Sequence, residues 1–231
     1  PFHGEGYRKV WAKLRHQGIR TSRARTLRLM REHGLQAPHR AGLCRGPRSH
    51  DGSIIPDAVD VMWGTDMTAT FTLEEGPACV FVAIDHFSGA LVGVHAAKNG
   101  TRFEALEPIR QGVRERFGAF GAQTAHGLKV RHDHGSQYMS GDFQDELRFL
   151  GIESSPAFVR APEGNGCAER FIRTLKENLL WVRTFMNIEE LRRALLSFKE
   201  LYNREWLLER HGYKSPDQVR SSSGTCLAAA A

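Results

Sequence analysis

The chain has 231 residues, 41% of them hydrophobic, and a formal net charge of +6 at pH 7. This length fits one medium domain with a small accessory module, and the apolar content excludes a wholly disordered chain. The longest apolar run, residues 78–84, is too short to cross a membrane. The chain starts at Pro1 without an apolar signal segment, which indicates a fragment, a processed product or a trimmed chain.

Two short helices are expected within residues 1–38. Apolar residues recur at helical spacing over residues 7–14, and Gly18 ends this segment. Thr21 or Ser22 caps a second helix that runs to about His33. Its expected buried side is Ala24, Leu27 and Met30, and its arginines lie largely elsewhere: Arg23, Arg25, Arg28 and Arg31. This arrangement predicts a helix-turn-helix-like module.

Charge is unevenly distributed between this module and the rest of the chain. Residues 1–50 contain 12 Lys or Arg and 2 acidic residues, a balance of +10, whereas the remainder has 20 against 24, a balance of −4. A basic segment ahead of a mildly acidic body favours a DNA-binding arm, with Arg23, Arg25 and Arg28 as candidate contacts. The alternative is a helical hairpin with a solvated surface that packs on the body.

From about residue 59 the pattern changes to that of β-strands. Segments rich in Val, Phe, Thr and Ile predict three strands, over Met62–Phe71, Cys79–Asp85 and Ala90–Ala96. Gly76-Pro77 and Ser88-Gly89 supply the turns between them. The preceding residues 39–58, which are rich in Pro, Gly, Ser and Arg, are typical of a basic linker.

Helices and strands alternate in the remainder of the chain. In order, we expect a helix over Thr101–Phe117, a strand over Leu128–His132, a helix over Ser140–Leu150, a strand over Ile152–Pro156, a loop over Arg160–Cys167, and helices over Ala168–Thr184 and from Asn187 onward. The order predicts an α/β fold, a mixed sheet of three antiparallel strands followed by βα units with helices on both faces. The expected division is a helical module at 1–38, a linker at 39–58, the α/β core at 59–186, a helical extension at 187–220 and a flexible tail at 221–231.

Three acidic residues stand out by their positions in this fold. Asp66 lies within a strand, where a buried carboxylate is costly without a partner or a metal. Asp133 directly follows another strand, and sites in open α/β sheets form at the carboxyl ends of strands. Glu169 opens a helix, and 35 residues separate it from Asp133. Clustered carboxylates repel one another, so the three residues predict a site that contains cations.

The ligand types favour magnesium. Mg²⁺ prefers carboxylate oxygens and leaves positions for phosphate and water, whereas His- or Cys-rich ligation indicates zinc. Two such ions about 3.5–4 Å apart suit an in-line phosphoryl displacement. Asp66, Asp133 and Glu169 are therefore the candidate catalytic residues and metal ligands.

Basic residues follow Glu169 on the same expected helix. Arg173 lies one turn further on and Lys176 nearly two turns, so both share the face of Glu169. We expect Lys176, Arg173 and Arg170 to contact DNA phosphates, with a solvated helix face as the alternative.

Other acidic and metal-binding candidates were weighed against these three. The chain has 26 acidic residues, so spacing alone decides nothing and position carries the argument. Asp85 is interpreted as a turn residue at a strand end. His132 and His134 flank Asp133 and either tune it or contact DNA. The four cysteines, none in CxxC spacing, indicate neither a zinc site nor a disulfide framework and fit a reducing cytoplasm: Cys44, Cys79, Cys167 and Cys226.

Three segments resemble the acidic motifs of one enzyme family: WGTDMT, VRHDHGSQY and PEGNGCAERFIRTLKENL. They look like those of insertion-sequence transposases in the retroviral-integrase superfamily, and most of all the second-reading-frame protein of the insertion sequence three family. The Asp133–Glu169 interval and Lys176 match the DD(35)E(K/R) signature of that family. The resemblance covers about residues 5–220 and departs in two places: the Pro-His pair usual after Tyr202-Asn203 is missing, as is an upstream DNA-binding and dimerising segment.

The resemblance implies a ribonuclease-H-like fold and phosphoryl transfer on DNA with two Mg²⁺ ions, for which Mn²⁺ can substitute. Water would cleave a phosphodiester at the end of the mobile element, and the 3′-hydroxyl released would attack target DNA. In this scheme Asp66 bridges both ions, and Asp133 and Glu169 each hold one. A homo-oligomer on DNA, associated with the bacterial nucleoid, is also implied. The alternatives are a nuclease of the same fold that only hydrolyses nucleic acid, a non-catalytic DNA-binding descendant of a transposase, and a metal-free structural domain.

Overall fold

The computed structural model describes residues 2–37, 56–157 and 165–228. The chain order of the elements is α1 (Tyr7–His16), α2 (Arg23–Glu32), β1 (Met62–Thr72), β2 (Gly76–Asp85), β3 (Leu91–Ala97), α3 (Arg102–Phe117), β4 (Lys129–His132), α4 (Ser136–Met139), α5 (Gly141–Leu150), β5 (Glu153–Pro156), α6 (Gly166–Leu175), the π-helix η2 (Lys176–Leu180), α7 (Ile188–Glu205), the 3₁₀ helix η3 (Glu209–His211) and α8 (Pro216–Ala228). Over these residues, no helix is long and apolar enough to span a membrane.

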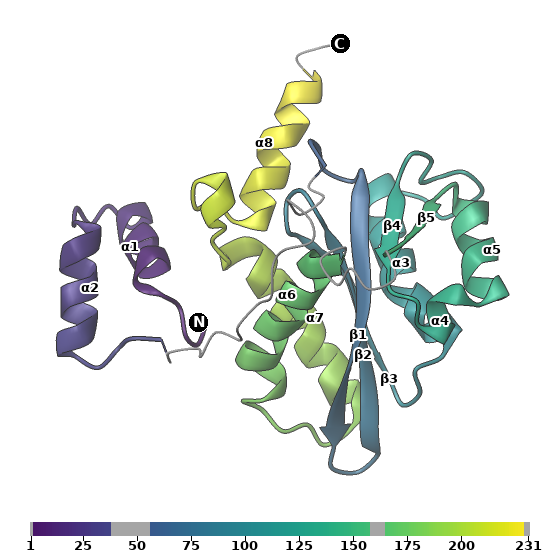
Figure 1. Cartoon of the computed structure of the whole chain (residues 1–231), viewed down its shortest axis with the longest axis horizontal. Coiled ribbons are helices and arrows are strands. Elements are labelled where there is room, and N and C mark those ends of the chain that lie inside the picture. The colour runs from purple at the N-terminus through teal and green to yellow at the C-terminus, as the bar shows by residue number, and fades with distance from the viewer. Residues whose placement is uncertain (1, 38–55, 158–164, 229–231) are drawn as a thin grey trace, which may run out of the picture.

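The five strands form one sheet in the order β3-β2-β1-β4-β5 (Figure 1). The first three strands are antiparallel neighbours, and β4 and β5 run parallel to β1. This confirms the mixed sheet predicted from the sequence. One turn was placed wrongly: Gly76 and Pro77 already belong to β2, and the chain reverses at residues 73–75 instead.

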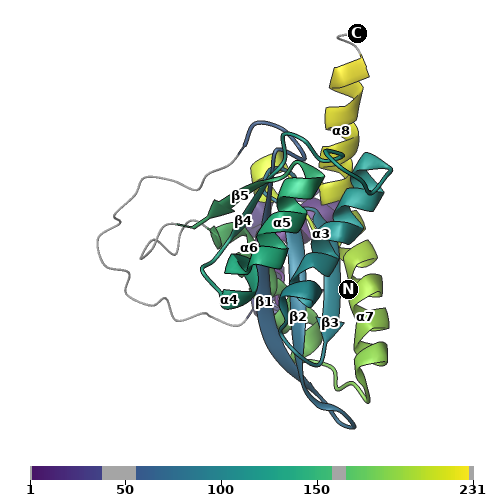
Figure 2. The same cartoon turned by 90° about the vertical axis from the view of Figure 1, so that its right-hand side faces the viewer.

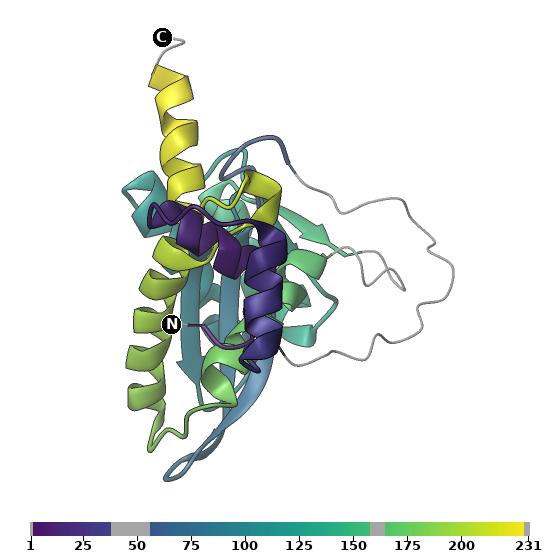
Figure 3. The same ribbon diagram turned by 90° about the vertical axis from the view of Figure 1, so that its left-hand side faces the viewer.

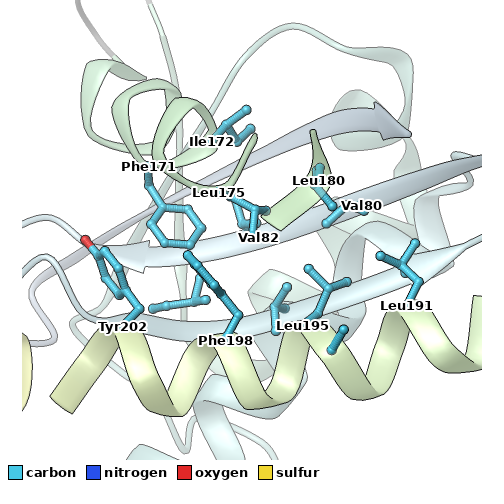
Figure 4. Packing of buried hydrophobic residues seen from close by; sticks show 14 of the residues in the cluster. Val80, Val82, Phe171, Ile172, Leu175, Leu180, Leu191, Leu195, Phe198 and Tyr202 are labelled. Atoms are coloured by element: carbon cyan, nitrogen blue, oxygen red, sulfur yellow. The ribbon is translucent and has the colours of Figure 1, made fainter. Parts of the chain in front are cut away.

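Helices cover both faces of the sheet (Figure 2), as predicted. Alternate residues of a strand point to opposite faces, so β2 contributes to two separate cores. Val80, Val82 and Ile84 pack with α6 and α7 on one face, and Phe81 and Ala83 pack with α3 and α5 on the other. Figure 4 shows α6 and α7 meeting over the first face, with Phe171, Leu175 and Phe198 between them and the strands.

The N-terminal helices form a pair whose first helix docks on the C-terminal part of the chain (Figure 3). Trp11 and Ala12 pack with Leu207 and Tyr213, and the Trp11 and Tyr213 rings are 6.0 Å apart. In Figure 1, α1 lies between α2 and the body of the molecule. This docking leaves α2 on the outside.

The details of α2 support part of the prediction. Ser22 caps the helix by accepting a hydrogen bond from the Arg25 N–H at 3.1 Å. Met30 is buried as expected, but Ala24 is exposed and the buried position is Thr26 instead. Thr26 lies one turn before Met30 on the same face of the helix, so the buried side of α2 runs through these two positions.

The C-terminal region is more regular than predicted. Asn187 caps α7 as expected, because its side chain accepts from the Glu190 N–H at 3.0 Å. The tail at 221–231 was expected to be flexible, but α8 continues through it to Ala228. Helix α8 is anchored at Arg220, which forms ion pairs with Asp60 and Asp85. Most of the predicted linker at 39–58 lies outside the described residues.

A tight contact between β3 and α3 generates a first prediction. A Cβ atom on Gly93 would lie 1.9 Å from the Pro108 carbonyl oxygen, so any side chain there must push backbone apart. We expect Gly93→Ala to lower the free energy of unfolding by about 1–3 kcal/mol, as overpacked cores do. Urea denaturation measures this loss of stability. Gly141→Ala is the matched control, because nothing lies within 4 Å of its Cβ position. Equal stability of the two variants would contradict the packing described.

Candidate active site

The three predicted acidic residues come from three elements that meet at one place. Asp66 lies in the middle of β1, Asp133 is the first residue after β4, and Glu169 is in the first turn of α6. β1 and β4 are parallel neighbours with Gly64 opposite Arg131. Two residues further along both strands, Asp66 therefore comes level with Asp133. Helix α6 packs against β1 and brings Glu169 to the same region.

The pKa of Asp66 reflects both its burial and the nearby charges of the other two acids. That pKa is raised to about 6, chiefly by burial and in smaller part by the charges of Asp133 and Glu169. The Met67 N–H, which donates to Asp66 Oδ1 at 2.7 Å, and the charge of Lys176 act in the opposite direction. Asp66 thus lies within electrostatic reach of both other acids and of Lys176.

Asp133 is held by the turn that follows it. Its Oδ1 accepts a hydrogen bond from the Gly135 N–H at 2.8 Å. A Cβ on Gly135 would lie 2.9 Å from that same oxygen and 2.6 Å from Gln137 Nε2, so glycine keeps this turn tight. The carboxylate itself is exposed, and so is the neighbouring His134.

His132 proves to be part of the core. It is fully buried, and its ring stacks on Tyr138 with the centroids 5.6 Å apart. Its two ring nitrogens lie 2.6 Å from the Asp133 carbonyl oxygen and 2.9 Å from Ser154 Oγ. Burial lowers the pKa of His132 and favours the neutral ring. Of the two roles predicted for this histidine, direct contact with DNA is excluded by its burial.

Glu169 projects from the start of α6. Much of its side chain faces solvent, yet partial burial still raises its pKa. Across the described part of the chain, no group of three or more His, Cys, Asp and Glu side chains is close enough to hold a metal ion. Like charges without a cation keep apart. The donor set nonetheless fits a hard cation, because it consists of carboxylates whose mutual repulsion already raises the pKa of Asp66.

The helix that carries Glu169 is shorter than predicted. We expected it to reach Thr184, but α6 ends at Leu175 and Lys176 begins the π-helix η2, which ends at Leu180. The wider turn is closed by the Trp181 N–H, which donates to the Lys176 carbonyl at 2.9 Å. π-Helical turns of this kind recur near functional sites. Lys176 is thus located where the helix geometry changes.

The basic residues expected at DNA separate into different environments. Arg170 and Arg173 are exposed on α6. Arg170 lies within electrostatic reach of Cys167 and Tyr202. On α2, Arg25 is exposed, whereas Arg28 pairs with Glu32 at 3.1 Å. The guanidinium of Arg23 lies 4.4 Å from the Trp11 ring centre and helps to join the two helices.

Asp85 is the turn residue that the sequence indicated. It is fully buried, and it accepts hydrogen bonds from Ser88 N–H at 2.7 Å and Asp60 N–H at 3.0 Å. Burial raises its pKa, while Ser88 and the nearby Arg220 lower it. These contacts fasten the β2–β3 turn to the segment before β1 and to α8, so Asp85 has a structural role.

Sequence reasoning missed Asn165. We interpreted Gly164-Asn165-Gly166 as part of a flexible loop, but Asn165 is 4% exposed and Gly166 begins α6. The Asn165 Nδ2 donates to the Thr65 carbonyl of β1 at 3.0 Å. Residues 158–164 of the predicted loop lie outside the described part. The only sequence signal was an amide side chain directly before the helix of Glu169.

Comparison with protein families matches almost the whole chain. An HTH-like domain matches residues 5–41, and two models, each described as an integrase core domain, match residues 56–162 and 150–216. The transposase for insertion sequence element IS629 of Shigella sonnei is 28% identical over 94% of this chain and 74% of its own length. Transposase InsD of insertion element IS2 from Escherichia coli is 28% identical over 91% and 71%.

The chain belongs to the integrase-core family of insertion-sequence transposases. It is therefore an enzyme of the DDE transposase and integrase class, as the resemblance in sequence implied. The integrase core family is metal-dependent.

Solved structures agree on the fold. The catalytic core of BIV integrase superposes with a TM-score of 0.52 at 19% identity and covers 72% of this chain and 97% of its own. The HTLV-2 integrase catalytic core, solved in complex with magnesium, gives a TM-score of 0.52 at 20% identity over 73% and 99%. This transposase thus has the ribonuclease-H-like core that was predicted.

Loss of the carboxylate charge is expected to change the stability of the protein differently at Asp85 and at Asp133. Asp85→Asn removes one of the two carboxylates paired with Arg220 and weakens the hydrogen bonds of the buried turn, and it should lower the free energy of unfolding by about 3 kcal/mol. Asp133→Asn removes a repulsive charge from an exposed position and should leave the melting temperature in EDTA unchanged or slightly higher. Differential scanning fluorimetry compares them. A large loss of stability in Asp133→Asn would mean that Asp133 is structural, as Asp85 is.

Proposed function

We propose that Asp66, Asp133 and Glu169 hold two Mg²⁺ ions, or Mn²⁺ in their place, for DNA cleavage and strand transfer. One observation carries the proposal. Carboxylates from β1, β4 and α6 lie within electrostatic reach of one another, since Asp133 and Glu169 both raise the pKa of Asp66. The integrase core family is metal-dependent, which supports a metal-binding role for these three acids. Asp66, central to the three, would contact both ions, with one further ion contact each for Asp133 and Glu169.

Two bound Mg²⁺ ions would supply neutralisation of the phosphate charge and stabilisation of the attacking and leaving oxygens. The residues of the chain have separate tasks. Asp66 is rigidly held within β1 and sets the position of the site. Lys176 lies beside the acids and is suited to bind a DNA phosphate as a compact positive charge. Arg173, exposed one turn before it on the same helix side, would bind the next part of the backbone.

The proposed contacts with DNA rest on the outward position of α2. Arg25 and Arg28 on this helix are exposed, and α1 alone faces the body. We propose that α2 binds DNA near the ends of the mobile element, while the core cleaves each end and joins it to the target DNA. Joining two ends to one target requires at least a homodimer on DNA, and the reaction belongs in the bacterial cytoplasm at the nucleoid.

A cleavage and strand-joining assay tests the function. Wild type is expected to nick labelled DNA that carries the element end and to join the 3′-end to a second duplex, both only with Mg²⁺ or Mn²⁺. Asp133→Asn should lower both rates at least a hundredfold, because the cation loses a ligand. Asp145→Asn, an exposed acid on α5 paired with Arg148, is the control and should match wild type. Cleavage without joining would favour a simple nuclease, and full activity of Asp133→Asn would contradict the site.

The DNA-binding role of α2 is tested separately. We expect Arg25→Ala with Arg28→Ala to weaken binding about tenfold at moderate salt, and to reduce the slope of log affinity against log salt by about 2, since two phosphate contacts are lost. Fluorescence anisotropy over a salt series measures both. Arg148→Ala removes an exposed arginine from α5 and serves as the control. An unchanged salt slope in the double variant would remove α2 from the DNA interface.

A further inference from the structure

Asn165 occupies the N-cap position of the helix that carries Glu169, but its side chain does not cap that helix. Helix N-cap asparagines ordinarily accept a hydrogen bond from an N–H of the first turn. Asn165 makes no such bond. Its Nδ2 instead donates to the carbonyl oxygen of Thr65, 100 residues away and directly before Asp66, at 3.0 Å. The side chain therefore joins two elements of the site.

The contact is buried and tightly packed. Asn165 is 4% exposed, and its Oδ1 is enclosed without a hydrogen-bond partner within the described structure. A Cβ on Gly64 would lie 2.9 Å from that oxygen and 2.6 Å from His86 Nε2, so the absence of a side chain at Gly64 admits the amide. An enclosed acceptor without a partner is unfavourable.

The hydrogen bond supplies what the packing of α6 lacks. The buried residues Ala168, Phe171, Ile172 and Leu175 fix which side of α6 faces the sheet. Apolar packing is non-directional, so it does not by itself specify a bond between α6 and one position of β1. A slip of one turn would move Glu169 by about 5.4 Å. The bond from Asn165 to β1 fixes the axial position of α6.

Glu169 lies one helical turn after Asn165, and Asp66 directly follows Thr65. We propose that Asn165 is a positioning residue that fastens the start of α6 to β1 and so sets Glu169 at the height of Asp66 for metal binding. This inference rests on the proposed metal function of the site. It assigns Asn165 no contact with DNA or with the reacting atoms.

Hydrogen exchange and Mn²⁺ binding together test the proposal on the full chain. In Asn165→Ala, the amides of residues 170–173 are expected to exchange at least about tenfold faster than in wild type, because the start of α6 is no longer fastened. The dissociation constant for Mn²⁺, measured from the free-ion paramagnetic resonance signal, should rise about tenfold, as for other residues that orient metal ligands. Asn165→Asp, which keeps the shape but turns the donor into an acceptor facing the Thr65 carbonyl, should show the same two changes.

Asn187→Ala is the matched control, because it removes a true N-cap asparagine from α7. It should loosen the start of α7 and leave Mn²⁺ affinity within twofold of wild type. The proposal is overturned if Asn165→Ala leaves exchange in α6 unchanged, or if it loosens α6 while Mn²⁺ binds as in wild type. Failure of wild type itself to bind Mn²⁺ would refute the proposed metal function, and with it the purpose assigned to this contact. The exchange data would then still report whether the bond fastens α6.

Discussion

The parallel pairing of β1 with β4 is the constraint on which the site depends. Because the two strands run in the same direction with Gly64 opposite Arg131, Asp66 comes level with Asp133, the residue that follows β4. Placing carboxylates together is unfavourable, and burial with neighbouring charges raises the pKa of Asp66 to about 6. The apolar cores on the two faces of the sheet stabilise this arrangement, since they fix β1 and β4 independently of the acids. A bound cation would then relieve a repulsion that the fold imposes.

Helix α6 completes the site from the other side of β1, and its contacts reach beyond the core. Phe171, two residues after Glu169, packs on Tyr202 with ring centroids 4.9 Å apart. Tyr202 stacks on Trp206, whose ring also contacts Phe2 and lies beneath the Lys9 ammonium. Burial in this contact lowers the pKa of Lys9 to about 7. Phe2 and Lys9 of the N-terminal region therefore contact the same aromatic cluster as the helix of Glu169, which links the N-terminal module to α6.

The sequence was sufficient for the fold class, the strand order of the meander and the positions of Asp66, Asp133 and Glu169, because strand periodicity and turn residues are local signals. It was insufficient wherever a distant contact decides the structure. Asn165 looked like a loop residue because its partner is the Thr65 carbonyl, 100 positions earlier. The helix through Thr184 appeared continuous because no residue marks the π-helical turn at Lys176. The tail after Ser221 lacks apolar periodicity, and α8 is held instead by the ion pairs of Arg220 with Asp60 and Asp85.

We propose that Asp66, Asp133 and Glu169 bind the metal together, although they remain apart without it. Anomalous diffraction from crystals grown with Mn²⁺ and an element-end DNA tests this binding. We expect an Mn²⁺ peak in contact with both Asp66 and Asp133, and Glu169 turned inward to ligate a second ion beside it. Well-ordered carboxylates with no anomalous peak between Asp66 and Asp133 at saturating Mn²⁺ would contradict it.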